Sequence, residues 1–297
     1  MKVLVLGSKG QLGRCLCDQL SVTQYEVIYT SRAEIDIGDL VTTKKKITDI
    51  KPNVVINASA YSAVDKAEED RQTADLINHL AVANIANTCK YLDCWLIHIS
   101  TDYVFDGAAN KPYSEDDGTN PQSVYGCSKL NGELAICSSG CQYLIIRTAW
   151  VFSEYGNNFL KTMLLLGTDH DELSIIGDQI GCPTYGPDLA KAIICTLPFL
   201  ELFQQNEIYH YAGNSSCSWA ELAQSIFDEA ERVKILNNKP NIVMITSEEY
   251  PTMAKRPINS QLDSSKFEAK FEHKASDWKL GIRASIRSLY NPIDIKK

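Results

Sequence analysis

The sequence predicts an α/β fold in which helices cover both faces of a parallel, doubly wound sheet. Short runs of β-branched residues and leucine alternate with longer helical patterns through the first half of the chain. The first of these runs ends directly in a turn that contains three glycines. The composition agrees, because 44% hydrophobic and 22% charged residues are typical of globular proteins, and 297 residues suffice for one large or two modest domains.

The composition also argues against several kinds of partner. Lys and Arg number 29 against 37 Asp and Glu, and the net charge of −8 argues against nucleic acid or an anionic membrane. We find no signal peptide and no apolar run of membrane-spanning length, so we expect a cytoplasmic protein. The ten cysteines lack zinc spacings, and we therefore predict buried free thiols and no metal site.

The chain opens with a predicted strand, a glycine turn and a helix. Lys2–Leu6 has the composition of a buried strand, Gly7, Gly10 and Gly13 follow it, and a helical pattern continues to Leu20. Glycines permit a tight turn and a close approach of the backbone, and the start of a helix offers free N–H groups to a pyrophosphate. This order predicts a Rossmann-like dinucleotide-binding site.

The residues after the second predicted strand, Glu26–Tyr29, bear on the choice of cofactor. Chains that bind NAD usually end this strand with an acid for the ribose 2′-hydroxyl. Here Thr30, Ser31 and Arg32 follow, and a missing acid beside a guanidinium suits a 2′-phosphate. The sequence favours NADPH and leaves NADH open, because Arg32 could equally be a solvated loop residue.

Small residues follow the third predicted strand. Leu40–Ile50 is a predicted helix, and Val54–Asn57 is the strand after it. Ala58 and the small residues beyond it would let a cofactor ribose lie against the backbone. A long helix is then predicted over approximately Arg71–Tyr91.

The fourth predicted strand, Trp95–Ser100, leads to candidate catalytic residues. Open α/β sheets bind ligands at the carboxyl ends of their strands. Ser100 and Thr101 are therefore placed to hydrogen-bond a reacting oxygen. Asp106–Gln122 is rich in Gly, Pro, Asp and Asn and is predicted to be a loop.

A Tyr-x-x-x-Lys pair follows that loop. Tyr125 and Lys129 are about one helical turn apart, so on a helix both side chains share one face. A nearby ammonium favours the phenolate and lowers the pKa of a tyrosine from its usual value of about 10. The pair is a candidate for proton exchange at neutral pH. The alternative is two surface residues on an amphipathic helix.

The pattern is looser in the second half of the chain. We predict a Rossmann domain over residues 1–150, with a last strand at Tyr143–Arg147. Residues 151–297 are predicted to form mainly a smaller α/β substrate-binding lobe, with some elements returning to the first sheet. The elements predicted there are a helix ending at Leu166, strands Leu173–Ile176 and Ile208–Ala212, and helices Pro187–Phe203 and Ser218–Arg232.

These motifs agree in order and context with one known family. Over nearly its whole length the chain resembles the dTDP-4-dehydrorhamnose reductase family of the extended short-chain dehydrogenase/reductase superfamily. The glycine turn and the Tyr125/Lys129 pair are shared across the superfamily. The motifs that point to the narrower family are Ser100–Phe105, Asn157–Phe159 and Arg256–Asp263, with Trp150 and Asp178–Gln179 in addition.

The resemblance implies a reaction. NADPH would deliver hydride to the C4 keto carbon of dTDP-4-dehydro-L-rhamnose, the last step of dTDP-L-rhamnose synthesis for cell-surface polysaccharide. Tyr125 would protonate the keto oxygen, and Thr101 would donate a hydrogen bond to it. Lys129 would tune Tyr125 and hold the nicotinamide ribose.

The resemblance also implies the binding residues. The pyrophosphate would meet Gly10, Gln11 and Leu12, and the Arg256 segment would close over the nucleotide diphosphate of the substrate. The implied cofactor-binding residues are Gly7, Gly10, Gln11, Leu12, Gly13, Arg32, Asp36, Ile37, Ala58, Ala60, Tyr61, Ser62, Ser100, Tyr125 and Lys129. The implied substrate-binding residues are Thr101, Asp102, Tyr125, Trp150, Asn158, Arg256 and Asn259.

The sequence departs from the family at one place and leaves alternatives open. Some members are dimers bridged by magnesium on acidic residues, but this chain has Cys15 and Pro187 near the expected positions, with Asp188 adjacent. We therefore expect a monomer or a homodimer without a metal bridge.

Two other functions remain: a different nucleotide-sugar 4-ketoreductase or epimerase, and a non-catalytic regulatory subunit like that of methionine adenosyltransferase. The nucleotide base and the stereochemistry of the product are also open.

Overall fold

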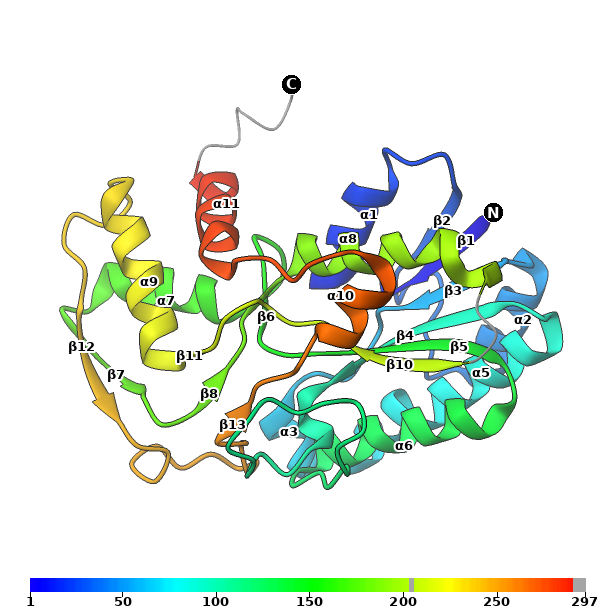
Figure 1. The fold of residues 1–297 in the computed structure, drawn as a ribbon, viewed down its shortest axis with the longest axis horizontal. Helices are drawn as coiled ribbons and strands as arrows, with labels where there is room; N and C mark the ends of the chain where they lie inside the picture. Colours follow the sequence, from blue (N-terminus) through cyan, green and yellow to red (C-terminus); the bar gives the residue numbers. More distant parts are fainter. Residues whose placement is uncertain (203–205, 291–297) are drawn as a thin grey trace.

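A six-stranded parallel sheet forms the centre of the molecule (Figure 1). The computed structural model describes residues 1–202 and 206–290. The strands are ordered β10-β5-β4-β3-β1-β2, and every adjacent pair is parallel. Their bounds are β1 (Lys2–Leu6), β2 (Glu26–Thr30), β3 (Val54–Asn57), β4 (Trp95–Thr101), β5 (Gln142–Thr148) and β10 (Glu207–His210). The predicted α/β fold class is confirmed.

Helices cover both faces of this sheet. In β1, Val3 and Val5 face one hydrophobic core, and Leu4 and Leu6 face the other, because successive side chains of a strand point to opposite faces. In Figure 1, α1 and α8 lie above the sheet, and α5 and α6 lie below it. The first face is covered by α1 (Gln11–Leu20), α8 (Gly186–Thr196) and α10 (Ser265–Phe271), and the second by α2 (Leu40–Ile50), α5 (Ala81–Leu92) and α6 (Val124–Ser139).

The order of the strands in the sheet reverses direction between β1 and β3. β2 pairs with one side of β1 and β3 with the other, so the direction in which strands are added reverses at β1. Leu6 and Asn57 are register partners at the carboxyl ends of these two strands. In open α/β sheets, ligands bind at such a reversal, beyond the carboxyl ends of the strands.

A second group of elements surrounds its own core on the left of Figure 1. Its helices pack around Phe227, Trp278 and other buried apolar side chains. The domain boundary near residue 150 stays a prediction, and β10 and α10 are later elements that pack with the central sheet. The elements of this group are α7 (Phe159–Asp169), α9 (Trp219–Arg232), α11 (Trp278–Tyr290), the pair β7 (Glu172–Ile176) and β12 (Asn241–Ile245), the pair β6 (Val151–Phe152) and β9 (Thr184–Tyr185), and the strands β8 (Ile180–Gly181), β11 (Cys217–Ser218) and β13 (Asn259–Ser260).

The long helix predicted over Arg71–Tyr91 is interrupted. It consists of α4 (Arg71–Asp75), the π-helical turn η1 (Leu76–Leu80) and α5, and a separate helix, α3 (Val64–Glu69), precedes it. Asp70 ends the first helix and starts the next, because its side chain accepts a hydrogen bond from Thr73 N. A π-helical turn often marks a functional region, and this one carries Asn78, whose contacts are described below.

The helix predicted over Pro187–Phe203 is also shorter than expected. α8 ends at Thr196, and the 3₁₀ turn η3 (Leu197–Leu202) follows it. Pro198 lies in that turn, and a proline has no N–H with which to continue an α-helical ladder. Phe203 lies outside the described residues.

The structure shows how exposed the cysteines are and how long and apolar the helices are. All ten cysteines lie in the described ranges and are free thiols; six are buried as predicted, but Cys17 and Cys195 are half-buried and Cys127 and Cys137 are exposed. Among the described residues, no helix is long and apolar enough to cross a membrane.

A buried ion pair joins α6 to β5. The side chain of Arg147 donates to Glu133, with NH2 2.7 Å and Nε 3.0 Å from carboxylate oxygens, and the side chains are 4% and 2% exposed. Removing one partner of a buried pair leaves an uncompensated charge and costs about 3–5 kcal/mol. We expect Glu133→Ala to lower the free energy of unfolding by that amount in urea denaturation.

The control for this prediction is Asp228→Ala. Asp228 pairs with Lys239 at 2.6 Å, but these side chains are 50% and 40% exposed. Loss of such an exposed pair costs about 1 kcal/mol or less. Equal losses in the two variants would contradict the assignment of the Glu133 pair to the core.

Candidate active site

The glycine turn after β1 is shaped for close approach of a ligand to the backbone. Gly7 has φ +81°, a conformation that favours glycine. A Cβ on Gly13 would lie 2.1 Å from the Gly7 carbonyl oxygen, so the first turn of α1 packs against the glycine turn itself. In the part of the chain that the structure describes, no side chain caps the start of α1 at Gly10. The N–H groups at this helix start suit an anion, and the residues fit the pyrophosphate of a dinucleotide.

Gln11 connects this turn to the second group of elements. Its Nε2 donates to the Val151 carbonyl oxygen at 2.9 Å, and its Oε1 accepts from Asn158 Nδ2 at 2.8 Å. Asn158 also caps α7, because its Oδ1 accepts from Lys161 N at 3.1 Å. Asn158 is therefore held by structural hydrogen bonds, and its contact with substrate stays a prediction. Leu12 lies against the core beneath the turn.

The end of β2 carries both cations and an acid. Arg32 is 85% exposed at its side chain, and its Nε donates to Asp36 Oδ2 at 3.1 Å. Glu34, which sequence reasoning did not weigh, accepts hydrogen bonds from the amide and hydroxyl of Ser31. Lys9 lies close enough to contribute to the lowered pKa of the Glu34 carboxyl, after the larger effect of the Ser31 bonds. Two cations, Lys9 and Arg32, thus lie near the end of β2. Ile37 is buried beside this site.

The loop after β3 is fixed by a residue that the sequence did not identify. Asn78, in the π-helical turn η1, accepts from Tyr61 N at 2.9 Å and donates to Tyr61 O at 3.0 Å. Its Nδ2 also donates to Ser128 Oγ on α6 at 3.0 Å. The loop is thereby held against the helix that carries Tyr125. Ala60 and Ser62 are exposed and Ala58 is half-buried, so this backbone is open to a ligand.

Thr101 and Tyr125 are brought together at the carboxyl end of β4. Ser123 caps α6 by accepting from Gly126 N at 3.1 Å, which fixes the start of the helix that carries Tyr125. Tyr125 is half-buried, and burial raises its pKa to about 12, while a hydrogen bond with Thr101 lowers that pKa in part. Thr101 Oγ1 itself donates to Asp102 Oδ1 at 2.9 Å.

Lys129 lies in the interior and does not lower the pKa of Tyr125 in this structure. It is 1% exposed, and its Nζ donates to the Ile99 carbonyl oxygen at 2.6 Å and lies 3.1 Å from His98 Nε2. Burial lowers the pKa of its own ammonium to about 8, against an opposing effect of Glu133. The prediction that this lysine holds the tyrosine pKa below 10 is therefore wrong here, because burial of the phenol dominates.

Two buried groups beside the tyrosine lack hydrogen-bond partners among the described residues. They are Asp102 Oδ2 and Ser100 Oγ, on side chains that are 4% exposed. Burial raises the pKa of Asp102 to about 6, although the Thr101 and Ser260 hydroxyls lower it in part. Unpartnered buried polar atoms are costly. A ligand with hydroxyl groups would satisfy both.

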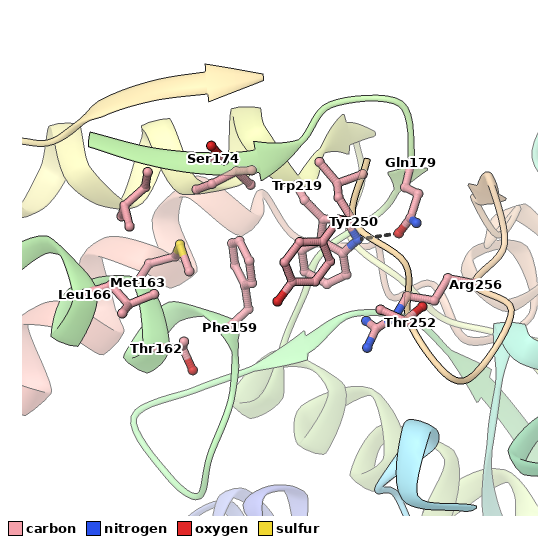
Figure 2. A pocket seen from close by; sticks show the side chains of 13 residues that line it. Phe159, Thr162, Met163, Leu166, Ser174, Gln179, Trp219, Tyr250, Thr252 and Arg256 are labelled. Carbon is pink, nitrogen blue, oxygen red and sulfur yellow. Dashed lines mark hydrogen bonds between the residues drawn. The ribbon is translucent and has the colours of Figure 1, made fainter. Parts of the chain in front are cut away.

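A pocket of about 470 Å³ opens beyond this site (Figure 2). Phe159, Trp219 and Tyr250 turn their rings toward it, and Arg256 lies at one end. Trp150 stacks on Trp219 with ring centroids 3.5 Å apart, so it supports this wall from behind. The pocket suits a flat, aromatic or apolar group next to an anion.

Arg256 connects the pocket to the tyrosines. Its Nη2 donates to Asp65 Oδ2 at 2.7 Å, and its Nε has no partner among the described residues. Its charge lowers the pKa of Tyr103, although burial has the larger effect and raises it. Tyr103 in turn packs edge-to-face on Tyr125, with ring centroids 5.5 Å apart. Pocket and catalytic candidates are therefore parts of one site.

Asn259 has a structural role in this arrangement. Its Nδ2 donates to the carbonyl oxygens of Ala109 and Lys111 at 2.8 Å, and its Oδ1 accepts from Gln261 N at 2.9 Å. These bonds tie the Arg256 segment to the loop before α6. Direct contact of Asn259 with a substrate stays a prediction.

The predicted departure at Cys15 and Pro187 can be located in the structure. Cys15 is buried in α1, and Pro187 lies in the first turn of α8, which packs against α1. Over residues 1–202 and 206–290, no group of three or more His, Cys, Asp or Glu side chains could hold a metal ion.

Comparison with known proteins identifies close relatives of the whole chain. The family model described as the RmlD substrate binding domain matches residues 1–291. A dTDP-4-dehydrorhamnose reductase of Aggregatibacter actinomycetemcomitans is 40% identical over 285 residues, which are 95% of this chain and 97% of the relative.

Solved structures agree with that match. The dTDP-4-dehydrorhamnose reductase of Clostridium acetobutylicum has a TM-score of 0.90 and 38% identity over 97% of this chain and 99% of its own. The reductase of Bacillus anthracis, solved in complex with NADP, has a TM-score of 0.88 and 33% identity over 96% of this chain and 98% of its own.

Proposed function

The chain belongs to the RmlD substrate binding domain family, and from this premise we propose that it reduces the C4 keto group of dTDP-4-dehydro-L-rhamnose with NADPH to give dTDP-L-rhamnose. The observation that carries the proposal is the placement of Tyr125 beside Thr101, whose hydroxyl lowers the pKa of the phenol in part and donates to the buried carboxylate of Asp102. A carbonyl that becomes an alcohol needs an acid and a hydrogen-bond donor at its oxygen, and this pair supplies both.

The cofactor is held by the glycine turn and the surrounding backbone. The N–H groups at the start of α1 would bind its pyrophosphate, and the lobe of residues 1–150 is proposed as the cofactor-binding domain. Lys9 and Arg32 would bind the 2′-phosphate. Lys129 and the backbone at Ala60 would face the nicotinamide ribose. When bound, NADPH supplies the hydride that reduces the carbonyl carbon.

Tyr125 supplies the proton. As charge develops on the keto oxygen, the phenol transfers its proton to that oxygen and becomes a phenolate. The burial that raises the pKa of Tyr125 to about 12 keeps the phenol protonated until that moment. The single hydroxyl proton of Thr101 is donated to Asp102 Oδ1 in this structure, and rotation about the Cβ–Oγ1 bond would turn it to the keto oxygen instead. Asp102 Oδ2 would accept from a sugar hydroxyl.

The nucleotide part of the substrate fits the neighbouring pocket. Phe159, Trp219 and Tyr250 would pack against a pyrimidine base, and Arg256 would bind the diphosphate through its unpartnered Nε. Trp150 would form a wall between this pocket and the sugar. Residues 151–297 are therefore proposed as mainly the substrate-binding lobe.

The proposal is tested by turnover with the substrate generated in situ from dTDP-glucose by the two preceding reactions. Oxidation of NADPH with release of NADP⁺ is expected. An epimerase would instead retain NAD through purification and show no net oxidation. A regulatory subunit would bind cofactor without turnover. Either of these results would overturn the reductase proposal.

The cofactor preference has its own test at Arg32. We expect Arg32→Ala to raise KM for NADPH roughly tenfold and to leave KM for NADH unchanged, because one charge-assisted hydrogen bond to the 2′-phosphate is worth about 1.5 kcal/mol. Arg283→Ala, which removes an exposed arginine from α11, is the control. Equal changes for the two cofactors would argue against a 2′-phosphate contact.

A further inference from the structure

His98 lies buried in β4 between two nitrogen donors. The imidazole is 0% exposed. Its Nδ1 lies 3.2 Å from Asn57 Nδ2, and its Nε2 lies 3.1 Å from Lys129 Nζ. A neutral imidazole carries one proton, so one ring nitrogen must donate and the other must accept. Burial is the main reason that the pKa of His98 lies well below its usual range, so the ring is neutral.

The orientation of Asn57 decides which ring nitrogen accepts. Asn57 Oδ1 accepts a hydrogen bond from the Ser59 backbone N–H at 3.1 Å. The NH₂ group of the amide therefore faces His98 and donates to Nδ1. With Nδ1 as the acceptor, the single proton of the ring is on Nε2.

The Nε2–H group then points at Lys129 Nζ, which must accept the hydrogen bond with a lone pair. The neutral amine of a lysine has one lone pair, and it can still donate to the Ile99 carbonyl oxygen at 2.6 Å. An ammonium has no lone pair, so it would set N–H against N–H. It could bond to His98 only if the ring moved its proton to Nδ1, which would set Nδ1–H against Asn57 Nδ2 instead.

We propose that His98 is a positioning residue that favours the neutral amine of Lys129, and that protonation of Lys129 is coupled to a change of tautomer in His98. Burial of Lys129 favours the neutral amine, and one nearby charge opposes it. Glu133, one turn along α6, favours the ammonium, but its carboxylate is engaged by Arg147 of β5. The pKa of Lys129, lowered to about 8 by burial, puts the exchange near neutral pH.

The consequence for turnover rests on the proposed function. After Tyr125 gives its proton to the product, the phenolate must be protonated again. The Lys129 ammonium, with a pKa of about 8, is a stronger acid than the Tyr125 phenol, with a pKa of about 12, so transfer of a proton from the lysine to the phenolate is favourable, and above about pH 8 the lysine no longer carries that proton. His98 would thereby set the pH range in which the enzyme recycles.

Nitrogen NMR of the full-length protein labelled with ¹⁵N-histidine tests the proton positions without any turnover. We expect His98 to remain neutral from pH 6 to pH 10, with its proton on Nε2 at high pH and on Nδ1 at low pH, and with a midpoint of about 8. A tautomer that is constant over this range would overturn the proposal. The His98 signals are assigned by their loss in His98→Gln or, if that variant does not fold, by elimination with variants of the other four histidines.

Asn57→Asp is a matched second test. The new carboxylate has nearly the shape of the amide, keeps the acceptor for Ser59 N–H, and accepts from Nδ1–H. This carboxylate should keep the proton of His98 on Nδ1 at every pH. The apparent pKa that Lys129 contributes to the pH–rate profile should then rise by about one unit or more. An unchanged tautomer would overturn the proposal. Loss of reductase activity with pH-dependent tautomers intact would instead count against the proposed function alone.

Discussion

Replacing Tyr125 with phenylalanine is expected to lower kcat by at least about 100-fold, with little change in KM for NADPH. The substitution removes the only atom that transfers a proton to the keto oxygen in our account and leaves the ring in place against Tyr103. A well-placed general acid is worth roughly 10²-fold or more in rate. Steady-state rates of NADPH oxidation, measured with the in situ substrate, give both constants.

Tyr143→Phe is the matched control for this prediction. Tyr143 is near the amino end of β5. It therefore lies in the same sheet as the site, but at the opposite end of the strands from the glycine turn. It loses the same oxygen atom, so any general effect of the substitution on the fold appears in both variants. Near-normal kcat in Tyr125→Phe would remove Tyr125 from the mechanism.

Replacing Lys129 with methionine is expected to lower both kcat and cofactor affinity. Methionine keeps much of the apolar length of the side chain but removes the nitrogen that bonds to Ile99 O and His98. In our account the same nitrogen binds the nicotinamide ribose and returns a proton to Tyr125. We expect kcat to fall about 100-fold, and Kd for NADPH to rise roughly tenfold, as for the loss of one hydrogen bond.

Fluorescence titration with NADPH measures the affinity of this variant without turnover. The control is Lys191→Met, because Lys191 is 52% exposed on α8 and pairs with Asp188 in its own helix. If Kd in Lys129→Met equalled that of the control while kcat fell, the ribose contact would be wrong and only the proton-transfer role would stand.

The central sheet could be predicted because its signals are local. Each strand is a short run of apolar residues, and the glycine turn follows the first of them directly. Burial of a strand on both faces leaves few polar residues in it, and that pattern is visible in any sequence of this class. The Tyr125/Lys129 spacing was equally visible, since it needs only one helix.

The side chains that surround Lys129 could not be predicted, because their partners are far apart in sequence. His98 is 31 residues from Lys129 and 41 from Asn57, and a single histidine in an apolar strand has no local sign of a partner. The wrong expectation for the pKa of Tyr125 has the same origin. Sequence spacing places a lysine near a tyrosine, but it gives neither the burial of the phenol nor the direction in which the lysine points.

The elements in the second half of the chain were harder to predict from the sequence, because they too depend on contacts between distant residues. Strands β8, β11 and β13 have two residues each and exist only through pairing with one another. Asn158 and Asn259 were expected to contact substrate, but the structure gives each several bonds to its own backbone surroundings. Asparagine suits helix caps and loop supports as well as ligands, and only the tertiary contacts distinguish these uses.

The most direct test of the account is transfer of deuterium from NADPH labelled at the transferable position of the nicotinamide C4. With dTDP-4-dehydro-L-rhamnose as substrate, we predict dTDP-L-rhamnose that carries one deuterium at C4 of the sugar, seen by mass spectrometry and by loss of the C4 proton signal in NMR. An unlabelled product, a label at another carbon, or no product while NADPH still binds would contradict hydride transfer to this carbonyl.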